Sequence, residues 1–173
     1  MRQLRIVFLL GLLLPLFYCG GCRVQYKLSG GRDFHDSVTV SVMTFTNSAP
    51  LAKATFPQSF SETMRDAIQR QTRLQTVAKN GDLNFEGTVV GYSVAPVSIQ
   101  GGGTNQASLN RLTVSISVKY TDLTNPALDF ESTFTRFADF PSSQNLTAVE
   151  DKLLKEISDQ LVQDIMNLSI NAW

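Results

Sequence analysis

The feature that most constrains the fold is a strict alternation of apolar and polar side chains in the second half of the chain. The apolar set is Leu112, Val114, Ile116, Val118 and Tyr120, and the polar set between them is Thr113, Ser115, Ser117 and Lys119. Since successive side chains of a β-strand point to opposite faces, this period of two puts every apolar group on one side. We therefore expect a long strand in a sheet with one face to bury and one polar face.

Two further extended stretches flank this strand. Residues 83–99 form an apolar-rich run that contains Gly87 and Gly91, which we expect to mark bulges or a bend in a long strand. A turn at residues 122–126 leads into Phe130, Ser132 and Phe134, which alternate with polar neighbours. Three consecutive long strands predict an antiparallel meander.

The first part of the chain predicts a strand, a helix and a second, short strand. Val38, Val40 and Val42 alternate with polar residues, and Phe45 ends this first strand. Leu74, Thr76 and Ala78 predict the short strand, and residues 80–82, Asn-Gly-Asp, are typical of a hairpin turn.

The helix between these strands is predicted from Thr55. Gln58 lies three positions further on, as in a capping box, and Pro57 falls in the first turn, where its missing N–H costs little. One stripe carries the apolar residues Phe56, Phe60, Met64, Ala67 and Ile68.

The chain closes with a longer amphipathic helix. Thr147 and Glu150 repeat the capping-box spacing. The apolar stripe that follows comprises Val149, Leu153, Leu154, Ile157, Leu161, Val162, Ile165 and Leu168. Because both helices have one apolar stripe and the sheet one apolar face, we predict an α+β two-layer sandwich in which two helices pack on one face of a four- to five-stranded mixed sheet. The first strand, helix and short strand would form a right-handed crossover. The other face, lined by Thr and Ser, would then be open, as a surface that lies against another protein could be.

The N-terminus predicts export and lipidation. Arg2 and Arg5 precede an apolar run, residues 6–18, that is too short to span a bilayer but is typical of a signal peptide. Gly20 and Gly21 stand directly before Cys22, in a pattern that resembles the lipobox of bacterial lipoproteins. We expect a signal peptide at residues 1–21, a lipidated tether at residues 22–36 that begins with Cys22, and a single α/β domain at residues 37–173. A soluble secreted protein with an incidental cysteine is the alternative.

The net charge and the cysteines that would remain after this cleavage exclude some classes of partner. Lys and Arg number 15 and Asp and Glu 15, so loss of Arg2 and Arg5 leaves a formal charge of about −2, which gives no field for nucleic acid. Cys19, after the bulky Tyr18, would be discarded with the signal peptide. No thiol would then remain for a disulfide or a metal.

Catalytic motifs are weak, and we expect neither an enzyme nor a cofactor. Gly91 to Ala95 approximate the nucleophile elbow around Ser93, but this serine lies in an extended stretch, and the one histidine, His35, is upstream. His35 has no companions for a metal site or a catalytic pair, which favours a solvated tether residue. The tract at residues 101–103, Gly-Gly-Gly, lacks the Lys-Ser/Thr of a phosphate-binding loop and suits a hairpin tip.

Several long stretches resemble the LptE-type lipopolysaccharide-assembly lipoproteins. They are TFTNSAPLAKATFPQSFSETMRDAIQRQTRL, GDLNFEGTVVGYSVAPVSIQG, LNRLTVSISVKYTD, DFESTFTRFADFPSSQNLTAVEDKLLKEISDQLVQDIMN and the terminal NAW. The resemblance implies a non-catalytic outer-membrane lipoprotein that plugs the large translocon barrel LptD, helps that barrel to assemble and contacts lipopolysaccharide during its insertion into the outer leaflet. Arg23 after Cys22, where Asp would retain a lipoprotein at the inner membrane, agrees with delivery to the outer membrane.

Lipopolysaccharide presents phosphates beside acyl chains, so its protein contacts need cations beside apolar surface. Arg111, Lys119 and Arg136 are the candidates, and an antiparallel hairpin would bring Arg111 and Arg136 towards the same end. The alternative is that all three are ordinary solvated charges.

Two other classes of function remain open. One is a periplasmic lipoprotein scaffold or activator of cell-wall enzymes, and the other is a lipoprotein hydrolase that uses Ser93.

Overall fold

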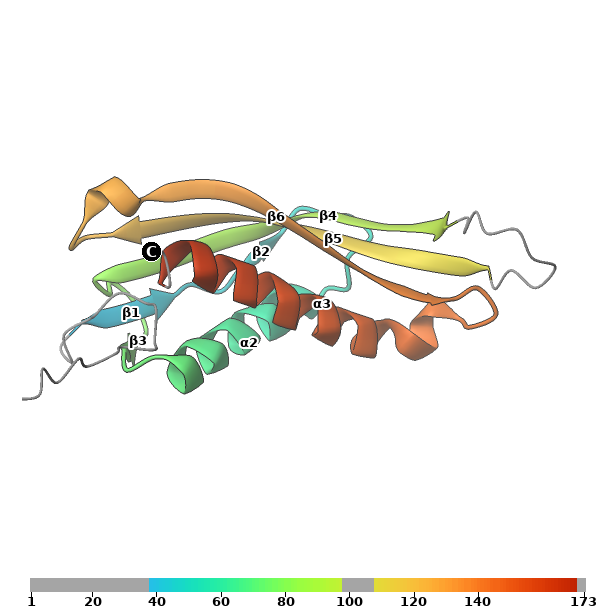
Figure 1. The fold of residues 1–173 in the computed structure, drawn as a ribbon, viewed down its shortest axis with the longest axis horizontal. Coiled ribbons are helices and arrows are strands. Elements are labelled where there is room, and N and C mark those ends of the chain that lie inside the picture. Colours follow the sequence, from blue (N-terminus) through green and yellow to red (C-terminus); the bar gives the residue numbers. More distant parts are fainter. Residues whose placement is uncertain (1–37, 98–107, 171–173) are drawn as a thin grey trace, which may run out of the picture. The chain divides into compact units, whose positions relative to one another are not determined.

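The computed structural model describes residues 38–97 and 108–170, which form two layers: a mixed β-sheet and two helices on one of its faces (Figure 1). The elements in chain order are β1 (Thr39–Val42), β2 (Thr46–Asn47), α2 (Phe56–Gln71), β3 (Gln75–Val77), β4 (Leu83–Val97), β5 (Leu109–Asp122), the short 3₁₀ helix η2 (Pro126–Leu128), β6 (Phe130–Pro141) and α3 (Leu146–Ser169). The α+β class and the two helices on one face are confirmed. The sheet has six strands, not four or five, because the two-residue β2 also pairs with β4.

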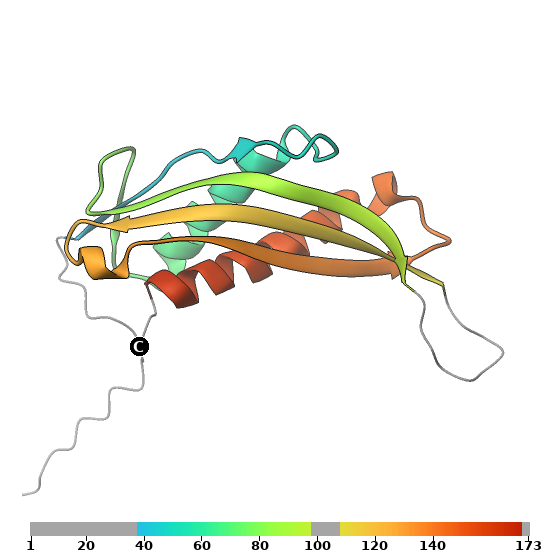
Figure 2. The same ribbon diagram turned by 90° about the horizontal axis from the view of Figure 1, so that it is seen from above.

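The strands lie in the order β3-β1-β4-β5-β6, and β2 pairs with β4 beside β1. The long strands β4, β5 and β6 form the predicted antiparallel meander and lie side by side in Figure 2. β1 is parallel to both of its neighbours, β3 and β4. The unit β1–α2–β3 therefore links two adjacent parallel strands through a helix, as predicted.

The prediction of a hairpin at residues 80–82 is wrong. β3 and β4 do not pair with each other, because β1 lies between them, so the connection between β3 and β4 has to cross β1. At Gly81 a Cβ atom would come within 2.7 Å of the Ser41 amide nitrogen and 2.8 Å of the Val40 carbonyl carbon. Asn80 has a φ of 55°, in the left-handed region that Asn tolerates better than most residues. The turn residues therefore serve a close crossing and not a hairpin.

The two glycines of β4 have different roles. The pairing of β4 with β5 shifts register between Val89 and Gly91, which confirms a bulge there. Gly87 pairs regularly with Val118, so no bulge lies at this glycine. A Cβ atom at Gly87 would overlap the buried ring of Phe45, so the missing side chain makes room for the core.

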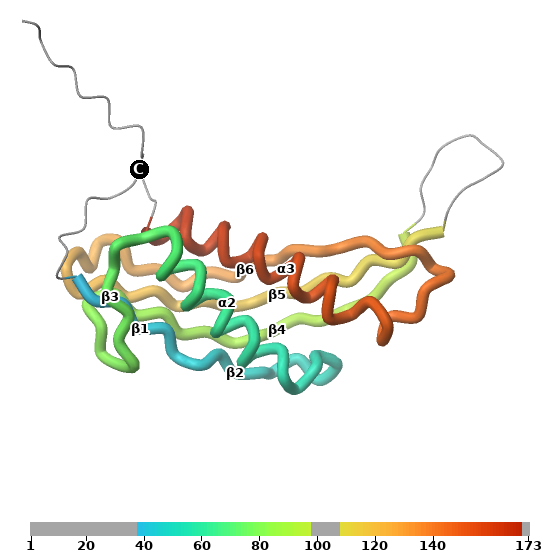
Figure 3. Tube along the Cα trace, turned by 90° about the horizontal axis from the view of Figure 1, so that it is seen from below, coloured from blue at the N-terminus to red at the C-terminus, as the bar shows by residue number. Residues whose placement is uncertain are grey.

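The core lies between the helices and the sheet (Figure 3). The predicted stripe of α2 is buried along its whole length. In α3 the buried stripe includes Leu153, Ile157, Leu161 and Ile165, but the predicted Leu168 is 49% exposed. Met166 and Ile170 are buried near the end of α3 in its place.

Both predicted capping boxes are wrong. Thr55 adopts helical φ and ψ angles and its side chain makes no capping hydrogen bond, while Gln58 donates to Glu62 within the helix. α3 begins earlier than predicted, because the Asn145 side chain accepts a hydrogen bond from the Thr147 amide at 3.0 Å. Within residues 38–97 and 108–170 no helix combines the length and the hydropathy needed to cross a membrane.

Candidate functional site

The sheet face opposite the helices carries mostly short hydroxyl side chains, as predicted. They come from neighbouring strands and hydrogen-bond to one another: Ser115 on β5 lies 2.8 Å from Thr135 on β6, and Thr46 on β2 lies 2.7 Å from Thr88 on β4, measured between hydroxyl oxygens. Hydroxyl groups can also hydrogen-bond to water or to a partner. We call this the open face.

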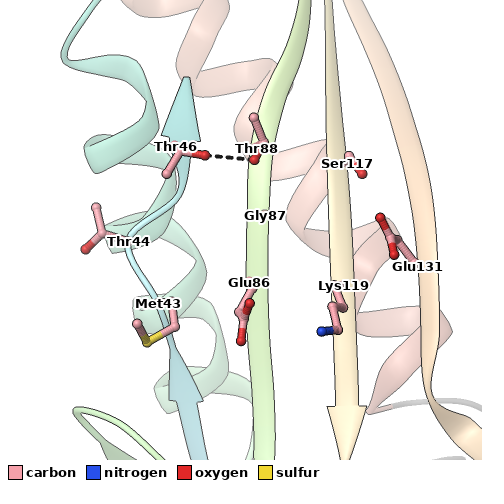
Figure 4. A pocket seen from close by; sticks show the side chains of 9 residues that line it. All are labelled: Met43, Thr44, Thr46, Glu86, Gly87, Thr88, Ser117, Lys119 and Glu131. Carbon is pink, nitrogen blue, oxygen red and sulfur yellow. Dashed lines mark hydrogen bonds between the residues drawn. The ribbon is translucent and has the colours of Figure 1, made fainter. Parts of the chain in front are cut away.

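A shallow hollow of about 400 Å³ lies on the open face. Its lining residues are Met43, Thr44, Thr46, Glu86, Gly87, Thr88, Ser117, Lys119 and Glu131 (Figure 4). Glu86, Lys119 and Glu131 stand opposite one another on β4, β5 and β6. Among the described residues none forms an ion pair with Lys119 within 4 Å. With two carboxylates against one ammonium, the hollow favours a cationic or neutral polar group over a phosphate.

Arg111 is also on the open face, where three interactions hold it. Its Nε and Nη2 atoms donate to the two carboxylate oxygens of Asp139 at 2.7 and 2.8 Å, and the pKa of this carboxyl is lowered mainly by these hydrogen bonds. The guanidinium carbon lies 3.6 Å from the centre of the Phe137 ring, which is 46% exposed. Arg111 thus presents a cation beside an exposed aromatic ring, but its charge is already paired.

Arg136 lies on the opposite face of the sheet. It pairs with the buried Val114, whereas Arg111 pairs with Asp139, so the two arginines differ in which side they face. Arg136 reaches α3 and donates to both oxygens of Asp164 at 2.5 and 2.6 Å. The pairing register does put Arg111 and Arg136 in the same half of the hairpin, as predicted, but they do not share a surface.

Lys119 is also distant from Arg111, because eight residues of β5 at about 3.4 Å each separate them by roughly 27 Å. The structure therefore does not gather Arg111, Lys119 and Arg136 into one cluster. Their carboxylate neighbours, Asp139 and Asp164, were missed in the sequence. The register of β5 against β6 is the signal that identifies Asp139, and periodicity alone does not supply it.

The hydrolase alternative requires Ser93 to lie on a strand-to-helix turn, and the structure does not place it there. Ser93 lies inside β4 and pairs with Thr113, so it is not on a strand-to-helix turn. Within the described part of the chain no three His, Cys or carboxylate side chains are grouped so that they could hold a metal ion. Cys22, His35, the tether and the glycine tract at residues 101–103 lie outside the described residues.

Comparison with solved structures identifies the same fold in other proteins. The PelC dodecamer from Paraburkholderia phytofirmans is similar with a TM-score of 0.51 and 14% identity, over 81% of this chain and 94% of that chain. The hypothetical protein CT253 from Chlamydia trachomatis gives a TM-score of 0.51 and 8% identity, over 76% and 96% of the two chains. At these identities the likeness shows the fold alone.

Comparison of the sequence is more specific. No curated protein matches the chain. The family model described as LptE, lipopolysaccharide-assembly, matches residues 37–169. This match spans almost every described element, from β1 to the end of α3. The chain therefore belongs to the LptE family of lipopolysaccharide-assembly proteins.

Proposed function

We propose that this protein is a non-catalytic outer-membrane lipoprotein that lies within an LptD-type barrel, plugs it, assists its assembly and contacts lipopolysaccharide as it enters the outer leaflet. The observation that carries the proposal is the family match over residues 37–169. LptE is a family of non-enzymatic lipoproteins, and the strand position of Ser93 agrees with this.

The anchor in this proposal is Cys22. After removal of residues 1–21, the lipid on Cys22 would hold the protein at the membrane, and residues 22–36 would link it to the domain at residues 37–173. At roughly 0.8 kcal/mol per buried CH₂, several acyl chains give a stable attachment where one chain would not.

The open face supports a role inside another protein. Its hydroxyl groups, and the two carboxylates and one ammonium of the hollow, suit a polar and hydrated contact more than a dry interface. Side chains that point into the lumen of a large membrane barrel are polar. We therefore assign the open face to contact with the lumen wall.

Arg111 is the favoured contact for a lipopolysaccharide phosphate. Its guanidinium can bind a phosphate in the bidentate way in which it now binds Asp139, and Phe137 offers apolar surface beside it. The phosphate has to displace the Asp139 carboxylate, so this carboxylate competes with the ligand. Lys119 and Arg136 remain weaker candidates. Two carboxylates flank Lys119, and Arg136 is bound to Asp164 on α3.

The barrel partnership is tested by co-purification. The tagged full-length protein would be extracted from membranes in mild detergent, and its partners identified by mass spectrometry. We expect one large outer-membrane barrel in stoichiometric amount, and loss of membrane attachment in Cys22→Ala. Recovery of cell-wall enzymes without a barrel would refute the proposal and favour the scaffold alternative.

The phosphate contact is tested by opposite changes at one pair. Arg111→Glu should weaken lipopolysaccharide binding by about tenfold or more, since a charge-assisted hydrogen bond contributes roughly 1.5–3 kcal/mol. Asp139→Asn should strengthen binding, because it frees the guanidinium. Arg70→Glu is the control, because Arg70 is an arginine of α2 whose side chain is 68% exposed. Binding that responds equally to Arg111→Glu and Arg70→Glu would remove Arg111 from the site.

A further inference from the structure

β6 is the outermost strand on one side of the sheet (Figure 2). The Ser142 amide donates to the Ser108 carbonyl at 2.9 Å. Hydrogen-bonded pairs alternate with non-hydrogen-bonded pairs along an antiparallel ladder. Because the register between β5 and β6 is unbroken, the even-numbered residues of β6 are those that hydrogen-bond to β5. The peptide groups of the odd-numbered residues, from Glu131 to Asp139, therefore point away from β5. No described strand pairs with this side of β6.

The other strand edges of the sheet are protected. β3, at the opposite end of the sheet, has three residues. The outer side of β4 beyond β2 carries the bulge before Gly91 and then Pro96, and both features discourage the addition of another strand. β6 has twelve residues, no bulge, no lysine, and a proline only at its last position. A long edge of this kind is a template for another strand.

Both sides of the β6 edge offer space for the side chains of an added strand. On the open face Phe137 is 46% exposed beside the edge. On the helix side a hollow of about 510 Å³ lies between β6 and α3, lined by Arg136, Asp159, Gln160, Gln163 and Asp164. An added strand places alternate side chains on these two sides, which is how strand addition gains specificity.

We propose that the outer edge of β6 binds an extended segment of the LptD-type barrel by β-strand addition. This inference rests on the function proposed above. Every strand in the wall of a closed barrel is already paired on both edges. The segment that adds to β6 therefore belongs to a loop of the barrel protein and not to a wall strand. Its side chains alternate: an apolar residue packs on Phe137, and a polar residue hydrogen-bonds to Gln160 and Gln163 in the hollow.

A second copy of this chain is a poorer occupant of the same edge. The β6 strands of two copies can pair antiparallel with the open faces of both copies on the same side. Two registers of this kind pair the largest number of residues. One places Glu131 opposite Asp139, and the other places Arg136 opposite Arg136. Like charges directly opposite one another destabilise a strand pair.

The test removes one outward donor from the edge. Thr133 is exposed, its amide points outward, and Thr133→Pro leaves the hydrogen bonds to β5 in place. Val94→Pro is the matched control, because the pairing of β4 with β5 directs the Val94 amide to the outer edge of β4. Thr133→Lys is a second blocking variant that keeps the backbone amide, and circular dichroism checks that each variant is folded.

The readout is a photo-crosslinking amino acid at position 160 of the full-length protein in growing cells, in the hollow beside β6 and not on the open face, with the adduct mapped by mass spectrometry. We expect one adduct to a loop of the barrel, reduced about tenfold or more by both Thr133 variants and unchanged by Val94→Pro. An adduct to the barrel wall or to a second copy, or one that the Thr133 variants leave unchanged, overturns the inference. If the barrel co-purifies and no adduct forms, the inference fails and the proposed function stands; if no barrel is recovered, both fail.

Discussion

Ser61 connects α2 to the segment between β1 and β2 through one buried hydroxyl group. The hydroxyl accepts a hydrogen bond from the Phe45 amide at 2.9 Å and donates to the Pro57 carbonyl at 2.7 Å. Ser61 has no exposed surface and Phe45 is 3% exposed. In Ser61→Ala, water therefore cannot easily replace the lost acceptor, and the Phe45 amide is left without a partner.

The expected cost follows from the stranded amide. A buried donor left unsatisfied costs about 1–3 kcal/mol. The bond to Pro57 is the common one from a helix serine to the carbonyl four residues earlier, and its loss is partly offset by the higher helix propensity of alanine. We therefore expect Ser61→Ala to lower the free energy of unfolding by about 1–3 kcal/mol.

Ser158→Ala is the matched control. Ser158 is 4% exposed on α3 and donates to the Leu154 carbonyl at 2.7 Å, but among the described residues no backbone amide donates to its hydroxyl as the Phe45 amide donates to that of Ser61. Urea denaturation followed by circular dichroism measures both variants, and Ser61→Ala should shift the midpoint by up to about 1 M with an unchanged m-value. If the two variants differ by less than about 0.5 kcal/mol, the reasoning from the stranded amide is refuted.

Two further predictions concern the crossing between β3 and β4. Gly81→Ala should lower the free energy of unfolding by about 2 kcal/mol or more, because its Cβ would meet the backbone of β1. Gly91→Ala is the control: its Cβ would lie 3.0 Å from the Ser115 Cβ, and it should lower the free energy of unfolding by less than about 1 kcal/mol. Equal losses for the two variants in urea denaturation would contradict the account of the crossing. Hydrogen bonds from the backbone and side chain of Thr39 lower the pKa of Asp82. The stability that Asp82 contributes is thus present above the unfolded pKa of about 4 and is lost as the pH falls through the lower folded value, so Asp82→Asn should flatten the acid side of a plot of urea midpoint against pH, and parallel curves would exclude this role.

Periodicity in the sequence located the elements whose burial is regular. The stripe of α2 and the alternation in β5 were correct residue by residue, because a packed face imposes its period on the sequence. The helix starts were less predictable. Asn145 caps α3 two residues before Thr147, and Glu150, the predicted second half of that capping box, accepts a hydrogen bond from Tyr92 on β4 at 2.5 Å.

The candidate site depended on information that a local pattern does not carry. Whether Arg111 and Arg136 share a face is decided by the register between β5 and β6, and a shift of one residue reverses the answer. Asn-Gly-Asp at residues 80–82 has the composition of a hairpin turn, but the strand order places β1 between the two strands that it joins. Both facts belong to the sheet as a whole and not to any short window of sequence.

The position of β1 also has a consequence for the order of folding. Each of its two sheet neighbours follows it in the chain, and Ser41 hydrogen-bonds to Asn84, 43 residues later. Contacts this distant form slowly, because a long loop must close first. Since a chain is synthesised from its N-terminus, the valines of β1 have no strand partner until β3 has followed, and no partner on their other side until β4 has followed. During that interval their side chains are exposed apolar surface that can aggregate.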